Sequence, residues 1–139
     1  MADYFTHFSC LIDVGSPDKA ARALALFQEL RAADQDADDL EVAGLTLVAQ
    51  DAPEGSMLWV HDDGYGDVDA VIRFVLRLAE ENDLTGLWDF QYALTCSRPR
   101  LDGFGGGAHV IDLGARKSIG WTSTQEWLNA ALNGEDAHA

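Results

Sequence analysis

Apolar and polar residues alternate along two long segments of the chain, residues 4–14 and residues 87–96. A period of two places successive side chains on opposite faces of a strand, so both segments are expected to be β-strands with one buried face. The apolar side of the second segment consists of Trp88, Phe90, Tyr92, Leu94 and Cys96. We expect these rings to pack in the core.

Shorter apolar runs occur in two pairs, each pair separated by turn-forming residues. Residues 45–50 and 57–61 flank one turn, and residues 108–113 and 118–122 flank another. Each pair predicts a strand–turn–strand hairpin. The intervening segment 97–107 contains four glycines and is expected to be a long loop.

Three segments carry apolar residues at helical spacing, and each follows a residue that caps helices well. Ser16 precedes the first, Asp67 the second, and Ser123 opens a Ser-Thr-Gln-Glu capping box before the third. The expected helices cover residues 17–33, 68–82 and 124–132.

The resulting order, β-α-β-β-α-β followed by β-β-α or by a variant with one strand fewer, predicts an α+β fold. We expect a ferredoxin-like βαββαβ antiparallel sheet with two helices on one face, extended by a C-terminal hairpin and a short helix. Residues 1–134 are interpreted as a single α+β domain and residues 135–139 as a disordered tail.

Composition places the chain among globular proteins. Of its 139 residues 47% are apolar, which suffices for a core without a metal or disulfide. Two cysteines predict reduced thiols, and the N-terminus does not resemble a signal peptide. No apolar run approaches the roughly 18 residues that span a bilayer. We therefore expect a cytoplasmic protein without membrane contact.

The formal charge of −15 is concentrated in one part of the chain. Residues 32–72 contain eleven acidic residues and no lysine or arginine, while the remainder has 13 acids and 9 bases, a net −4. Such charge disfavours direct contact with nucleic acid and favours the basic surface of a protein partner. The alternative is a solvated, solubilising surface. The candidate partner-binding residues are Asp34, Asp36, Asp38, Asp39, Glu41, Asp62, Asp63 and Asp67.

A segment rich in arginine and glycine, residues 98–109, offers a second candidate site. Backbone N–H groups of consecutive glycines and two guanidinium groups could hold a phosphate or carboxylate. The alternative is a folded-down loop with Phe104 in the core. The candidate ligand-binding residues are Arg98, Arg100, Gly105, Gly106, Gly107 and His109.

Other groups of residues are weaker candidates for a metal site or a catalytic site. The acidic glycine turn 62–69 lacks EF-hand spacing, and Asp67 has a simpler role as a helix cap. Cys96 could pair with His109 or His7, but cysteines in phase with apolar strand faces usually act as small hydrophobes. We predict no catalytic residue, metal ligand or cofactor.

Three stretches, Phe8–Gly15, Trp88–Tyr92 and Thr95–His109, resemble a family of uncharacterised small proteins of bacterial chromosomes, plasmids and phages. The resemblance implies no known activity or site residues. Its association with mobile elements suggests an inhibitor of a host defence complex.

The function favoured by the sequence is a non-enzymatic acidic binding protein. It would engage a basic protein surface, as a nucleic-acid-mimicking inhibitor of a defence or nucleic-acid-handling complex of the anti-CRISPR or anti-restriction type. The alternative is a small anionic-ligand-binding protein or enzyme using residues 98–109. A homodimer through a sheet edge is a further expected partner.

Overall fold

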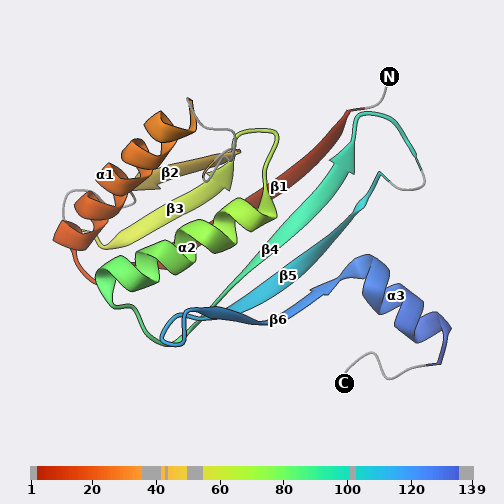
Figure 1. The fold of residues 1–139 in the computed structure, drawn as a ribbon. Helices are drawn as coiled ribbons and strands as arrows, with labels where there is room; N and C mark the ends of the chain where they lie inside the picture. Colours follow the sequence, from red (N-terminus) through yellow and green to blue (C-terminus); the bar gives the residue numbers. More distant parts are fainter. Residues whose placement is uncertain (1–2, 36–41, 43, 50–54, 101–102, 135–139) are drawn as a thin grey trace.

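The computed structural model describes residues 3–35, 42, 44–49, 55–100 and 103–134 (Figure 1). Six strands and three helices occur in these ranges. In chain order they are β1 (Tyr4–Asp13), α1 (Pro17–Asp34), β2 (Leu45–Ala49), β3 (Met57–Asp62), α2 (Val68–Asn82), β4 (Leu87–Cys96), β5 (Gly105–Asp112), β6 (Lys117–Ser123) and α3 (Thr124–Leu132).

The strands form one antiparallel sheet in the order β2-β3-β1-β4-β5-β6. The α+β class predicted from the sequence is therefore confirmed. The six-strand order differs from that of a four-stranded ferredoxin-like sheet, because β5 and β6 continue the sheet beyond β4. The finer ferredoxin-like assignment stays a prediction.

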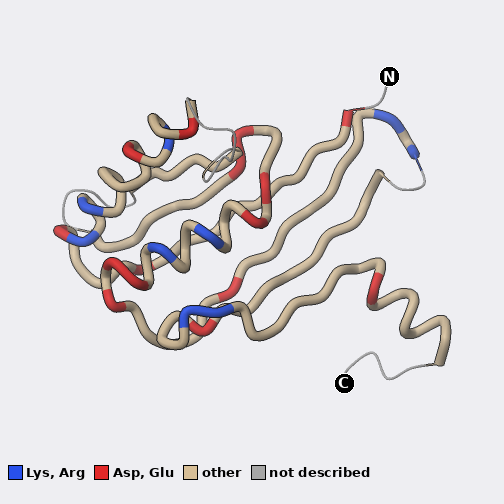
Figure 2. Tube along the Cα trace, in the orientation of Figure 1, with Lys and Arg blue, Asp and Glu red and all other residues tan. Residues whose placement is uncertain are grey.

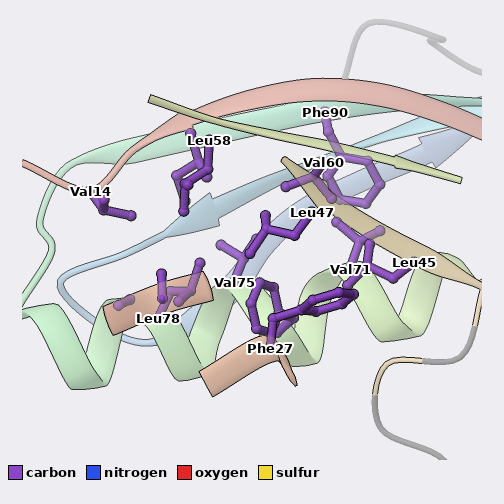
Figure 3. Packing of buried hydrophobic residues seen from close by; sticks show 14 of the residues in the cluster. Val14, Phe27, Leu45, Leu47, Leu58, Val60, Val71, Val75, Leu78 and Phe90 are labelled. Carbon is purple, nitrogen blue, oxygen red and sulfur yellow. The ribbon is translucent and has the colours of Figure 1, made fainter. Parts of the chain in front are cut away.

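The core lies between one face of the sheet and the helices α1 and α2, which both cover that face (Figures 1 and 3). Phe27 of α1 and Phe74 of α2 meet edge to face, with ring centroids 5.7 Å apart. Seven of the residues of α2 are buried. Of the aromatic row on β4, Phe90 is fully buried, and Trp88 and Tyr92 pack against the core while partly exposed.

Local signals at the helix starts are confirmed. The Ser16 hydroxyl accepts a hydrogen bond from Lys19 N, the Asp67 carboxylate from Asp69 N, and the Ser123 hydroxyl from Glu126 N. These side chains satisfy backbone N–H groups that have no partner inside the helix. The capping residues therefore fix where each helix begins.

Two expectations for the segment before β5 are wrong. The loop ends earlier than expected, because Gly105, Gly106 and Gly107 belong to β5 and pair with Leu94, Ala93 and Tyr92 of β4. A Cβ on Gly107 would overlap the Tyr92 hydroxyl, so the glycine leaves room for the Tyr92 side chain of β4 to lie against β5. Phe104 does not enter the core, since it is 58% exposed.

None of the described helices is both long and apolar enough to cross a membrane.

Candidate functional site

Several acidic residues gather at one end of the sheet, which we call the acidic end. There α1 ends, β2 begins, β3 ends and α2 begins (Figures 1 and 2). Backbone hydrogen bonds hold these segments together, from Asp63 N to Gly44 O at 3.3 Å and from Gly66 N to Thr6 O at 3.0 Å. The described acids of the acidic end are Asp34, Asp62, Asp63, Asp67 and Asp69.

Only part of this carboxylate set is free to meet a partner. Asp63 and Asp69 are exposed. Asp67 caps α2 and lies 3.7 Å from the Arg73 guanidinium, while Asp34 accepts a hydrogen bond from Val42 N at 2.9 Å. The remaining predicted partner-binding residues, Asp36, Asp38, Asp39 and Glu41, lie outside the described residues.

Asp62 has an internal structural role. Its carboxylate accepts hydrogen bonds from His7 Nδ1 at 2.8 Å, from Phe8 N at 3.0 Å and from Gly64 N at 3.0 Å. Burial alone would raise the pKa of Asp62, but these hydrogen bonds and the His7 charge outweigh it and lower the pKa. Asp62 therefore joins β1 to the turn after β3.

The pairing of His7 with Asp62 was not expected from the sequence, because 55 positions separate the two residues. The pair borders a shallow cleft of about 370 Å³ that Ser9 and Gln91 also line. A carboxylate that orients a histidine is one component of general-base catalysis. The neighbouring Ser9 hydroxyl, however, accepts a hydrogen bond from Trp59 Nε1 at 2.7 Å, which fits a structural network.

The arginine- and glycine-rich segment is divided between different environments. Arg98 and Arg100 are exposed, and the Arg100 N–H donates to the Arg98 carbonyl at 2.9 Å. Gly105–Gly107 are held in the sheet, so consecutive glycine N–H groups do not form the expected loop cradle for an anion. The structure thus gives the anion-site prediction no geometric support.

His109 lies on the helix-covered face of β5, where its ring stacks on Phe90 with centroids 5.5 Å apart. Burial lowers its pKa, and the charge of Asp69 offsets part of this effect. Its Nδ1 atom is buried without a hydrogen-bond partner. His109 therefore acts as a neutral ring packed beside the core.

Both cysteines are free and partly buried. Cys10 donates a weak hydrogen bond to the Val60 carbonyl at 3.6 Å, and burial raises the pKa of its thiol to about 12. A thiol with such a pKa is almost wholly protonated near neutral pH and is a poor nucleophile. Within the described ranges no three His, Cys, Asp or Glu side chains are grouped to hold a metal ion.

Comparisons with protein-family models, with curated proteins and with solved structures find no match to this chain. The resemblance to uncharacterised proteins of bacteria and phages stays a prediction, and the site is interpreted from its own geometry.

Proposed function

We propose that this protein is a non-enzymatic binding protein whose acidic end engages a basic surface on a protein partner. The observation that carries the proposal is the gathering of five described acids, Asp34, Asp62, Asp63, Asp67 and Asp69, where four elements meet. The described bases at this end are Arg31 in the last turn of α1 and Arg73 in α2. The local balance is therefore acidic.

The arrangement suits electrostatic recognition. Asp63 lies in the turn before α2 and Asp69 in its first turn, both exposed to solvent. Exposed charges of one sign accelerate association with an oppositely charged surface.

A nucleic-acid mimic is the form of this function that we favour. A partner that binds phosphate carries a basic groove, and closely placed carboxylates can occupy that groove in place of phosphates. The proposed partner is accordingly a nucleic-acid-handling or defence complex. Binding would then compete with duplex DNA or RNA for the same groove.

For the scaffold, we propose that residues Tyr4–Cys96 form a ferredoxin-like unit to which β5, β6 and α3 are added. The element order β-α-β-β-α-β and the antiparallel pairing of β1 with both β3 and β4 support this proposal. In such a unit, the acidic end lies where β2 begins and β3 ends, beside Thr6 and Phe8 of β1.

The test is capture of the partner by cross-linking in cells that produce the tagged chain, followed by comparison of two variants. The first, Asp63→Asn with Asp69→Asn, removes two charges from the acidic end and keeps the acceptor oxygen that Tyr65 N uses. The matched control, Glu80→Gln with Glu81→Gln, removes two exposed charges from the other end of α2.

We expect a basic partner whose capture is reduced in the first variant and retained in the control, and that nucleic acid displaces. A partner that both variants capture equally, or that both lose equally, would contradict recognition through the acidic end.

A further inference from the structure

One face of the sheet is left open by α1 and α2. Both helices cover the other face, and side chains alternate between the two sides along each strand (Figure 1). On β1 the buried Phe8 is followed by the exposed Ser9, and on β4 the buried Phe90 is followed by the exposed Gln91. We call the side that Ser9 and Gln91 share the open face.

The strand register places a row of polar and small residues across the open face. Ser9 pairs with His61 of β3 on one side and lies beside Gln91 of β4 on the other. Gln91 pairs with Ala108 of β5, and Ala108 pairs with Thr122 of β6. The row therefore crosses five strands, a span of about 19 Å at about 4.8 Å between neighbouring strands.

Three clefts follow this row. The first, of about 650 Å³, is lined by Trp59 and Ser9. The second, of about 370 Å³, is lined by Ser9 and Gln91, and the third, of about 350 Å³, by Gln91 and by Trp127 of α3. Because each cleft shares a residue with the next, the three form one shallow groove, which we call the open-face groove. A tryptophan ring lies near each of its ends.

The polar groups of the open-face groove can both donate and accept hydrogen bonds. The Ser9 hydroxyl accepts a hydrogen bond from Trp59 Nε1 at 2.7 Å, which ties the indole ring to the neighbouring strand and leaves the serine hydrogen available to donate. The amide of Gln91 and the hydroxyl of Thr122, both on exposed residues, supply donors and acceptors. A ligand that suits these groups carries both kinds of group as well.

The charges along the open-face groove disfavour an anionic ligand. Among the described residues that line the three clefts there is no lysine or arginine, and the carboxylate of Asp62 is bound by groups of its own chain. A phosphate chain would find no cationic side chain of this kind, and the net charge of −15 would repel it. A peptide crossing the strands could not join the sheet, because the main-chain groups of β4 and β5 pair with each other beneath the groove.

We propose that the open-face groove binds a neutral oligosaccharide. A sugar ring has an apolar C–H face, which packs on flat aromatic rings such as those of Trp59 and Trp127. Its hydroxyl groups each donate and accept, as do the side chains of Ser9, Gln91 and Thr122. A shallow groove about 19 Å long suits a linear chain of several sugar units better than a single enclosed ring. This inference does not rest on the proposed function of the acidic end.

The experiment is a screen of the fluorescently labelled full chain against immobilised neutral oligosaccharides, followed by calorimetry with the strongest binder. The probes are fragments of cellulose, starch, mannan and chitin of increasing length. We expect binding that strengthens with the length of the fragment until the groove is filled. Trp127→Ala and Gln91→Ala should each weaken it about tenfold. Both side chains are exposed, so these variants should fold, which circular dichroism checks.

Two control variants locate the site. Trp121→Ala removes a ring that is 65% exposed on the helix-covered face, where Trp121 pairs with His109, and should keep the affinity. Asp63→Asn with Asp69→Asn alters the acidic end and should also keep it, so the two proposals can fail separately. The proposal would be overturned if no neutral oligosaccharide bound, if the affinity survived both groove variants, or if Trp121→Ala lost as much as Trp127→Ala.

Discussion

Replacing Asp62 by alanine separates an internal structural role from a role in partner binding. The substitution removes three hydrogen bonds and leaves the N–H groups of Phe8 and Gly64 without their acceptor. A hydrogen bond to a charged group contributes about 1.5–3 kcal/mol and the three are not additive. The bond to His7 counts for less, because that side chain is 43% exposed.

We therefore expect Asp62→Ala to lower the free energy of unfolding by about 3 kcal/mol. With an unfolding entropy of about 2.1 cal/mol/K per residue, a chain of 139 residues should lose about 10 °C in Tm. Asp62→Asn should lose less, because its amide oxygen can still accept one of the backbone N–H groups.

Thermal melts followed by circular dichroism provide the measurement, with Asp63→Ala as the control. Asp63 is exposed, so its variant should change stability by less than about 0.5 kcal/mol. If the melting temperatures of the Asp62 and Asp63 alanine variants agree within about 2 °C, the internal role assigned to Asp62 is refuted.

Three further predictions concern the sheet. Burial lowers the pKa of His109 in the folded chain, so the unfolded chain takes up a proton at this residue at a higher pH, and the free energy of unfolding falls as the pH is lowered. The free energy of unfolding of His109→Phe, measured by chemical denaturation, should therefore fall less between pH 7 and pH 5 than that of the wild type. Equal decreases in the two proteins would contradict this prediction. Gly107→Ala should cost at least about 2 kcal/mol in urea unfolding, because its methyl group meets the Tyr92 ring, whereas Gly120→Ala, with open space at the Cβ position, should cost less. Cys10, with a thiol pKa of about 12, should resist iodoacetamide at pH 8 in the native chain and react in urea; rapid native alkylation, located by mass spectrometry, would show that the thiol is not buried.

Periodicity and capping predicted the helices and the strand β4 well, because those signals are local. The helices α2 and α3 and the strand β4 have the predicted bounds, and Asp67 caps α2 as expected. The start of β5 was missed because glycines usually indicate a turn, and only the position of Tyr92 on the neighbouring strand shows why they lie in a sheet.

Prediction of the candidate site was limited in the same way, because contacts between distant segments decide which side chains are exposed. The sequence located the acidic residues but could not distinguish Asp63, which is exposed, from Asp62, whose partners lie on β1. The apolar side of α3 was visible in the sequence as Trp127, Leu128 and Leu132. How far each of these side chains is exposed depends on the direction in which α3 leaves β6, which local patterns do not encode.

The proposed binding through the acidic end is tested most directly by the affinity for the captured partner. Calorimetry measures this affinity for the wild type and for the two double variants. We expect Asp63→Asn with Asp69→Asn to weaken binding about tenfold, or about 1.4 kcal/mol, and to reduce its salt dependence. Glu80→Gln with Glu81→Gln, which removes the same charge from the other end of α2, should change affinity by less than about twofold. Equal losses in both variants would show that bulk charge attracts the partner, and an unchanged affinity in the first variant would show that the partner binds elsewhere.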